Sequence, residues 1–249
     1  MSLRIATVKY LNALPFLHAL KELANRHLIE LVEATPAVCS ELLHRDQVDV
    51  ALMPVGAISD FEKLFIVSDY CISCDGSVRT VKLFSSHPIE ELQQIVLDNS
   101  SRSSNLLIQI LCREYWKKPD IIFTNRVNRI PNLKTGFVKI GDEVFELEDY
   151  FPYEYDLGLE WKSFTGLPFV FAAWVSKTKL KVTDIAMLND IFKSSLLSIS
   201  DLIANNIDLN QINLDGYFEK NIYYELDENR RKGLLKFLEL AGMRNPFQN

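Results

Sequence analysis

The chain has 249 residues, of which 48% are hydrophobic and 24% are charged, so collagen-like, disordered and disulfide-scaffold classes are excluded. A chain of this length buries a large core without a metal or disulfide, and it favours one or two domains. The net charge of −6 argues against a nucleic-acid partner, because phosphate backbones are bound by an excess of Lys and Arg.

The N-terminal part alternates predicted strands and helices. Residues 5–8, 28–32 and 48–53 are short apolar runs, which are typical of buried strands. Apolar side chains recur at helical spacing after Pro15, and Thr35-Pro36 is typical of the cap and first turn of a helix over residues 37–44. Strands that alternate with helices pair in parallel, so this part is predicted to be an α/β domain.

A second α/β set follows without a linker. Two strands, at residues 65–70 and 78–85, are predicted around the turn-forming Asp75-Gly76 pair. Further strands are predicted at residues 95–97, 121–123, 136–140 and 167–175, and helices at 103–115, 156–164, 184–203 and 228–240. The continuously apolar run 167–175 is predicted to be a buried strand, because a bilayer span needs roughly 20 residues.

These elements allow either one long sheet or two lobes joined by strands that pass between them. In both arrangements, ligands favour the crevice at the carboxyl ends of the strands. The polar loops at residues 10–14, 54–57, 73–80 and 98–104 are therefore the candidate ligand-binding segments.

Three of these loops are rich in hydrogen-bond donors. The serines of residues 98–104 and Arg102 stand directly before a predicted helix, whose N-terminus favours anions. The alternative there is an ordinary serine cap with a solvated arginine. Asn12, and the Asp75-Gly76 turn with Arg79 and Thr80, could likewise be donors or plain turn formers. Together these loops predict a small anionic ligand without identifying it.

The sequence lacks the residue patterns that other kinds of functional site require. Cys71 and Cys74 have CxxC spacing, but they have neither a second pair nor a helix start, so they are predicted to be structural thiols. The four histidines are dispersed, and no metal site is predicted. The GxSxG, P-loop and GxGxxG motifs are missing, which argues against serine hydrolases, nucleoside-triphosphate sites and dinucleotide sites.

At these same loops the sequence resembles the menaquinone biosynthetic enzymes of the futalosine pathway, and within them the chorismate dehydratase branch. Each matching block is weak alone, but the blocks stand in the family's order across nearly the whole chain. They are VKYLNALP (8–15), VDVALMP (48–54), DGSVRTV (75–81), LDNSSRSS (97–104), IGD (140–142), DLGLEW (156–161), TGLPFVFAAW (165–174), and a tail with IYY (222–224) and GL (233–234).

The resemblance implies a type II periplasmic-binding-protein-like fold, with two α/β lobes and a ligand cleft between them. We expect the chain to cross between the lobes near residues 83–86 and 169–174. Residues 1–86 and 172–249 would then form a discontinuous first lobe, and residues 87–171 a second lobe inserted in it.

The resemblance also implies a carbon–oxygen lyase that converts chorismate to 3-[(1-carboxyvinyl)oxy]benzoate and water, without a metal or organic cofactor. Loss of the ring hydroxyl with a ring proton creates an aromatic ring, so the reaction needs orientation and charge placement more than strong acids or bases. In the family, the proton acceptor is the substrate's own enolpyruvyl carboxylate.

The family's site residues carry over as follows. Asn12 matches the asparagine of its tyrosine-leucine-asparagine motif, and Thr80 stands where serine is usual, so these two are the candidate catalytic residues. After Pro54, Val55 and Gly56 stand where the family has a more polar pair, so any contact there would come from the backbone. The candidate substrate-binding residues are Tyr10, Gly56, Asp75, Arg79, Ser101, Arg102, Ser103 and Ser104.

Two other functions remain open. The 1,4-dihydroxy-6-naphthoate synthase of the same pathway shares the fold, but a base such as histidine is expected in its cleft. A non-catalytic binding protein for small anions is the second alternative. The N-terminus lacks the pattern of a secretory signal, so a cytoplasmic protein with a small dicarboxylate substrate and no membrane partner is expected.

Overall fold

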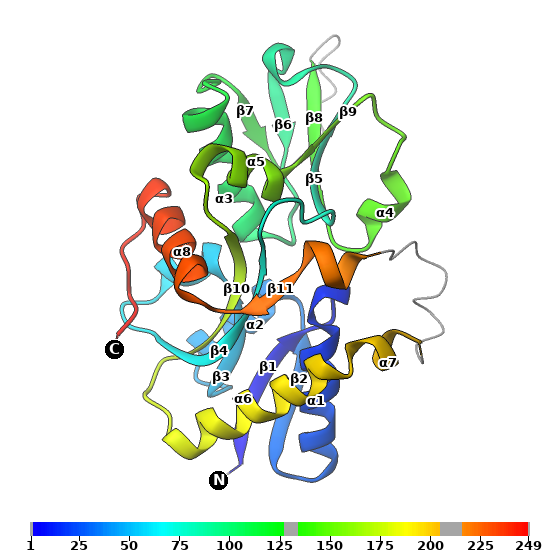
Figure 1. Cartoon of the computed structure of the whole chain (residues 1–249). Helices are drawn as coiled ribbons and strands as arrows, with labels where there is room; N and C mark the ends of the chain where they lie inside the picture. The colour runs from blue at the N-terminus through cyan, green and yellow to red at the C-terminus, as the bar shows by residue number, and fades with distance from the viewer. Residues whose placement is uncertain (1, 127–133, 205–215, 249) are drawn as a thin grey trace.

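The structure, a computed structural model, describes residues 2–126, 134–204 and 216–248. It contains two mixed sheets, which lie one above the other in Figure 1. The six-stranded sheet has the order β11-β4-β10-β3-β1-β2, and the five-stranded sheet has the order β7-β6-β8-β5-β9. The prediction of two α/β units is therefore confirmed.

The six-stranded sheet is built from both ends of the chain. Its strands are β1 (Leu3–Val8), β2 (Ile29–Ala34), β3 (Val50–Pro54), β4 (Phe65–Cys74), β10 (Phe169–Ser176) and β11 (Tyr223–Glu225). The helices of these chain segments are η1 (Leu11–Ala13), α1 (Leu14–Asn25), α2 (Pro36–His44), η2 (Val55–Asp60), α6 (Val182–Leu197), α7 (Ile199–Ala204), η6 (Tyr217–Asn221) and α8 (Glu228–Leu240).

The pairing of this sheet follows the sequence pattern. β1 pairs in parallel with β2 and β3, and the Thr35 hydroxyl caps α2 by accepting from the Val38 N–H at 3.5 Å. β10 lies antiparallel between β3 and β4 and is almost wholly buried, so the predicted buried strand is confirmed. Trp174 of β10 stacks on Phe192 of α6 with ring centroids 5.0 Å apart, which anchors that helix on the sheet.

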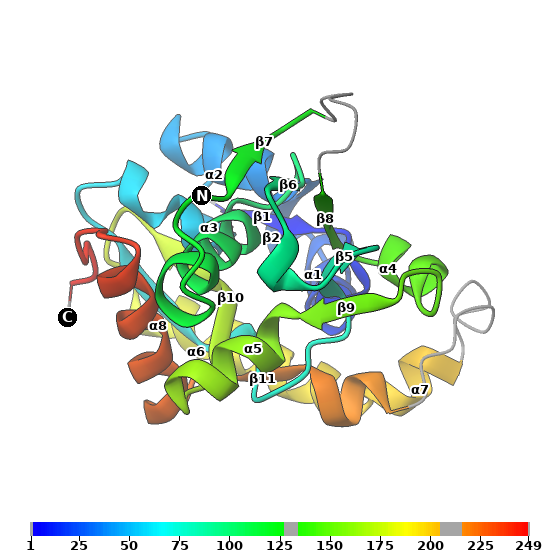
Figure 2. The same ribbon diagram turned by 90° about the horizontal axis from the view of Figure 1, so that it is seen from above.

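The five-stranded sheet uses the middle of the chain. Its strands are β5 (Val81–Ser85), β6 (Gln94–Val96), β7 (Ile122–Thr124), β8 (Thr135–Ile140) and β9 (Tyr153–Asp156). Its helices are η3 (Ile89–Glu91), α3 (Arg102–Ile110), which continues as a π-helical turn η4 (Leu111–Tyr115), α4 (Glu143–Leu147) and α5 (Leu157–Thr165). Seen from above in Figure 2, α4 and α8 lie on opposite sides of the molecule.

The chain changes sheets at points other than those the sequence predicted. Residues 81–85 were expected in the first lobe, but β5 pairs along its length with β8 and β9. Residues 169–171 were expected in the second lobe, but β10 belongs throughout to the six-stranded sheet. In both cases, hydrogen bonds to strands that are distant in sequence decide which sheet the strand joins. We propose lobe boundaries within residues 75–80 and 157–168.

The helices differ from prediction in several places, among them α4 and η6, which were not predicted. The helix predicted over residues 184–203 is two helices, because Ser198 (φ −104°, ψ 17°) ends α6 before α7 begins. In contrast, α8 spans the residues predicted for it. No helix in the described ranges is both long enough and apolar enough to cross a membrane.

Candidate functional site

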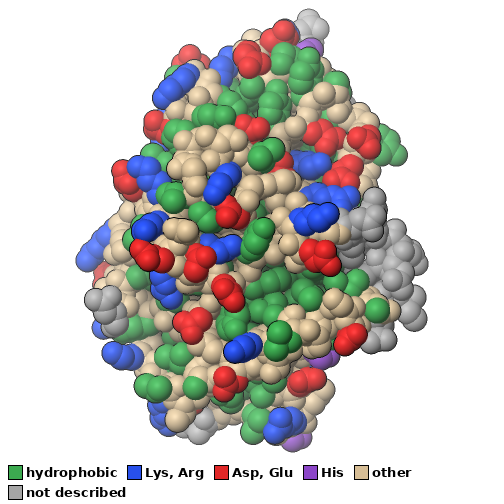
Figure 3. All heavy atoms as spheres, viewed as in Figure 1, with side chains coloured by type: hydrophobic (Ala, Val, Ile, Leu, Met, Phe, Trp, Pro, Cys, Tyr) green, Lys and Arg blue, Asp and Glu red, His purple; other side chains and the backbone are tan. Residues whose placement is uncertain are grey.

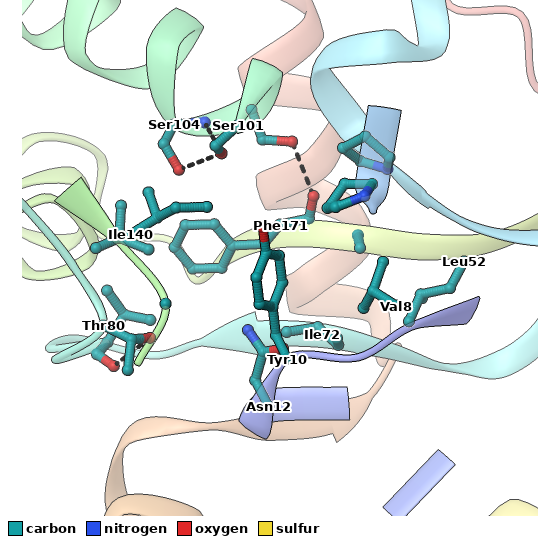
Figure 4. Close-up of a pocket in the computed structure, with 17 residues that line it drawn as sticks. Val8, Tyr10, Asn12, Leu52, Ile72, Thr80, Ser101, Ser104, Ile140 and Phe171 are labelled. Carbon is teal, nitrogen blue, oxygen red and sulfur yellow. Dashed lines mark hydrogen bonds between the residues drawn. The ribbon is translucent and has the colours of Figure 1, made fainter. Parts of the chain in front are cut away.

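A cavity of about 60 Å³ lies between the two sheets (Figure 4). β1, β3, β4 and β10 line it from one sheet, and β5, β8 and the start of α3 from the other. Its apolar lining residues are Val8, Pro36, Leu52, Pro54, Ile72, Val78, Val81, Ile140, Phe171 and Ala172. Its polar side chains are Tyr10, Asn12, Thr80, Ser101, Ser103 and Ser104. No charged side chain is among the lining residues in the described part of the chain.

The serines at the start of α3 have two different roles. The Ser103 hydroxyl donates to the Phe171 carbonyl at 2.9 Å and accepts from the Gly56 N–H at 3.1 Å, so it fastens α3 to β10 and η2. Ser101 is the N-cap of α3; its hydroxyl accepts from the Ser104 N–H at 3.2 Å and donates to Ser104 Oγ at 2.7 Å. Among the described residues, the Ser104 hydroxyl proton has no acceptor. It is therefore available to a ligand at this helix N-terminus.

Asn12 lies on η1, directly after β1, and Figure 4 shows it on the side of the cavity opposite the serines. The Tyr224 hydroxyl donates to its backbone carbonyl at 3.0 Å. Its side-chain Oδ1 is buried and has no hydrogen-bond partner among the described residues. A buried acceptor without a partner costs free energy, so this amide is suited to a ligand group that donates a hydrogen bond.

Thr80 is held at the point where the chain passes into β5. It follows Arg79, whose φ of 65° lies in the left-handed region. Two backbone N–H groups, of Val78 and Arg79, donate to the Asp156 carboxylate at 3.0 and 2.6 Å, which fixes this unusual turn. The buried Thr80 hydroxyl lies 3.2 Å from that of Tyr217.

The charged candidates are paired outside the cavity lining. Arg102 bonds to Asp60 on η2, and this ion pair lowers the pKa of Asp60. Arg79 bonds to Glu148 at 3.0 Å through two nitrogens and lowers the pKa of that carboxyl. Asp75 pairs with Lys162 at 2.5 Å. Contrary to the donor sets predicted from the sequence, these groups are absent from the residues lining the cavity in the described structure.

Gly56 is also not a lining residue, but it shapes the site. A Cβ atom there would lie 2.6 Å from the carbonyl carbon of Arg102 and 2.7 Å from the Ser103 nitrogen. Only a residue without a side chain allows η2 to approach the start of α3 this closely. In the structure the Gly56 backbone N–H donates to the Ser103 hydroxyl.

Tyr10 and Ile140 separate the cavity from a wider hollow of about 550 Å³. That hollow contains the charged groups that the inner cavity lacks, among them Asp98, Lys139 and Asp142. Lys9, which directly follows β1, lines neither space; its side chain is 65% exposed and lies 3.9 Å from Glu33. The inner cavity is thus an uncharged chamber beside a charged one.

Sequence reasoning missed two features of the site. Phe171 and Ile140 form apolar walls, and Tyr217 supports Thr80 from a segment far along the chain. The apolar character of β10 was visible in the sequence, but its contact with the cavity was not. No local signal marks Tyr217.

The remaining reactive side chains of the described residues do not form a second centre. None of the four histidines, all of which the structure describes, lines the cavity. Within the described ranges, no group of three His, Cys, Asp or Glu side chains is arranged to hold a metal ion. All four cysteines are free and buried, and burial raises the pKa of Cys71 to about 12. This fits the prediction of structural thiols.

Comparison with known proteins assigns the chain to a family. The sequence profile described as menaquinone biosynthesis matches residues 3–243. The chain belongs to this menaquinone biosynthesis family. It is 25% identical to a chorismate dehydratase of Thermus thermophilus, over 96% of this chain and 94% of that one.

Solved structures show the fold. A structural-genomics protein of Archaeoglobus fulgidus has a TM-score of 0.68 at 14% identity, with 97% of each chain covered. A Candida albicans gene product with the generic periplasmic binding protein fold has a TM-score of 0.65 at 12% identity, covering 97% of this chain and 90% of that one. The periplasmic aliphatic sulphonate binding protein SsuA of Escherichia coli has a TM-score of 0.56 at 13% identity, covering 98% and 94%. The predicted periplasmic-binding-protein-like fold is confirmed.

Proposed function

We propose that this member of the menaquinone biosynthesis family is a chorismate dehydratase, a carbon–oxygen lyase that forms 3-[(1-carboxyvinyl)oxy]benzoate and water. The observation that carries the proposal is the lining of the inner cavity. Apolar walls suit a six-membered ring, and uncharged hydroxyl and amide groups stand at its opposite sides. The named relative in Thermus thermophilus supports the same reaction.

The polar groups match the parts of the substrate. One carboxylate would be held at the start of α3 by the Ser104 hydroxyl and the free backbone N–H groups there. The unpartnered Asn12 Oδ1 would accept from the ring hydroxyl of the bound substrate and so fix the orientation of this leaving group. Thr80, on the side facing the second sheet, would donate to the other carboxylate.

The elimination breaks a ring C–H bond and the C–O bond of the neighbouring ring carbon. The C–H electron pair becomes the third double bond of the ring, and the proton leaves with the hydroxide as water. An uncharged cavity leaves the substrate's enolpyruvyl carboxylate without a neutralising cation, so that carboxylate stays basic enough to take the proton. The protein's own task is then to orient the dianion and exclude bulk water.

The sister reaction, which forms 1,4-dihydroxy-6-naphthoate, is less well supported. The base expected for it has no candidate in the inner cavity, since His18, His27, His44 and His87 all lie outside its lining. A non-catalytic role in binding small anions would use the same serines and would leave Asn12 and Thr80 without a chemical purpose.

The decisive experiment incubates the purified protein with chorismate, with no added cofactor, and follows the products by liquid chromatography and mass spectrometry. Chorismate without protein and chorismate with the Asn12→Ala variant serve as controls. A product lighter by one water with an aromatic absorption spectrum is expected with the wild-type protein, about 100-fold more slowly with Asn12→Ala, and not without protein. Unchanged chorismate that raises the melting temperature indicates a binding protein. Unchanged chorismate without such a shift contradicts the proposal and directs the search to the sister substrate.

A further inference from the structure

One segment near the C-terminus contacts both candidate catalytic residues. Residues 217–224, the orange ribbon between the two sheets in Figure 1, comprise η6 and the start of β11. The Tyr217 hydroxyl meets Thr80 Oγ1 at 3.2 Å, and the Tyr224 hydroxyl donates to the Asn12 carbonyl at 3.0 Å. Between them, the Asn221 amide donates to the Ser77 carbonyl at 2.9 Å. The segment thus supports both walls of the cavity without lining it.

The Tyr217–Thr80 hydrogen bond has a defined direction. The Tyr217 ring is fully buried, and its edge packs on Phe145 with ring centroids 5.6 Å apart. Burial also raises the pKa of Tyr217, so the phenol keeps its proton. Among the described residues Thr80 Oγ1 is the only hydrogen-bond partner of this hydroxyl, and an unsatisfied buried donor is costly. Tyr217 therefore donates to Thr80.

This direction sets the role of Thr80. Its oxygen accepts from Tyr217, so its own proton is free for a second acceptor. The Val78 carbonyl is one possibility, but at 3.5 Å it is a distant one. A ligand carboxylate in the cavity is a stronger acceptor. Tyr217 consequently makes Thr80 a hydrogen-bond donor toward the ligand.

Tyr224 acts on Asn12 in a related way. Its ring is buried and lies edge-on to Phe16 of α1, with centroids 5.2 Å apart. From this fixed position its hydroxyl holds the backbone carbonyl of Asn12, in the short η1 turn. Fixing that peptide restricts where the Asn12 side chain can point.

We propose that Tyr217 and Tyr224 are positioning residues that orient Thr80 and Asn12 for catalysis, an inference that rests on the proposed dehydratase function. Neither tyrosine touches the cavity; each acts through the residue it bonds. Their effects should therefore depend on the presence of that residue, which separates this role from a purely structural one.

The test is a pair of double-mutant cycles measured on kcat with chorismate. Tyr217→Phe removes only the hydroxyl and is expected to lower kcat by about five- to tenfold, the rate equivalent of one hydrogen bond. In the Thr80→Val background, the same change should have no further effect. Tyr224→Phe should lower kcat in the wild type and have no further effect in the Asn12→Ala background. If Thr80→Val is too slow to assay, the cycle is measured on the chorismate dissociation constant by calorimetry.

Tyr155→Phe is the matched control. The Tyr155 hydroxyl accepts from the Ile89 N–H at 2.8 Å in the five-stranded sheet, so the control also loses one hydrogen bond of a partly buried tyrosine. Its kcat should stay within about twofold of the wild type. If Tyr217→Phe lowers kcat by the same factor in the wild-type and Thr80→Val backgrounds, the positioning role of Tyr217 is wrong, while the proposed dehydratase function still stands. A wild-type protein that does not convert chorismate overturns the proposed function and this inference together.

Discussion

In the loops of the site, uncharged and charged side chains point in opposite directions. At the start of α3, Ser101, Ser103 and Ser104 line the cavity, while Arg102 between them turns outward to Asp60. Before β5, Thr80 lines the cavity, while its neighbour Arg79 bonds to Glu148. Uncharged donors thus face the cavity, and the charged groups form ion pairs outside it; we call these paired residues, Arg79, Glu148, Arg102 and Asp60, the rim.

Desolvation explains this difference. A charge facing an apolar chamber loses its hydration, whereas a hydroxyl can be satisfied by one or two hydrogen bonds. The rim charges keep both a partner and contact with water, and Figure 3 shows acidic and basic side chains interspersed over one face of the molecule. A substrate that brings its own two negative charges into such a chamber retains a basic carboxylate. The comparison therefore predicts that changes to the lining affect turnover and that changes to the rim affect stability.

The largest effect is expected from Gly56→Ala, because it forces the lining itself to move. The added Cβ would meet the Arg102 backbone at 2.6 Å, so α3 must shift. We expect a loss of about 3 kcal/mol of unfolding free energy from the overpacking. A fall of about 100-fold in kcat/KM is expected from the displaced serines. Thermal unfolding and steady-state kinetics measure the two effects.

Gly242→Ala is the control for backbone strain alone, since Gly242 has a φ of 66° and open space around its Cβ position. It should lower stability by only about 1 kcal/mol and leave kcat unchanged. Equal effects of the two substitutions would show that the approach of η2 to α3 is not what shapes the cavity.

Asn12→Ala should separate turnover from stability most clearly. Its Oδ1 makes no hydrogen bond in the described structure, so removing it leaves no partner unsatisfied. We expect kcat to fall by about 100-fold, the usual effect of losing one polar group at the reacting centre. The melting temperature should stay close to that of the wild type. Asn25→Ala, the same change at an exposed position at the end of α1, should alter neither quantity. A fully active Asn12→Ala variant would remove Asn12 from the mechanism.

Neighbouring residues of α3 provide a direct contrast between lining and rim. Ser104→Ala removes the hydroxyl proton that is free in the cavity and should raise KM about tenfold. Arg102→Gln breaks the partly exposed pair with Asp60 and should change KM by less than about twofold, because such pairs contribute little. A large rise in KM for Arg102→Gln would show that the guanidinium reaches the substrate when the lobes close.

The sequence predicted the local features of the site well. Ser101 caps α3 as its position before an apolar helix indicates, and Thr35 caps α2 in the same way. Both features depend on residues within four positions of each other. The six polar residues of the cavity lining were all among the candidates, because each lies in a predicted loop or turn next to a strand or helix or in a block that resembles the family.

Features set by distant partners could not be predicted. Arg79 turns outward because Glu148 is there, and Arg102 because Asp60 is there; nothing near either arginine in sequence announces the pairing. β5 was expected in the first lobe but joins the other sheet for a similar reason, because the apolar pattern of a strand does not say which strands it will pair with. The role of Gly56 depends on a backbone approach by residues 102 and 103, which only the folded chain reveals.

The smallest effect is expected from Glu148→Gln, which changes the rim alone. The measured quantity is the difference in melting temperature between this variant and the wild type as the pH is varied. Hydrogen bonds from Arg79 and Lys82 lower the pKa of the half-buried Glu148 carboxyl below its value in the unfolded chain. Its stabilising contribution is therefore present above the unfolded pKa and is lost as the pH falls through the lower folded pKa. The variant should melt about 2–4 °C below the wild type at pH 7, as expected for roughly 1 kcal/mol, and the two curves should converge in acid. kcat at pH 7 should be unchanged within about twofold, since the carboxyl and its partners serve the fold and not the ligand. A drop in kcat with no change in melting would place Arg79 in the substrate site after all, and the division between an uncharged lining and a charged rim would fail at that loop.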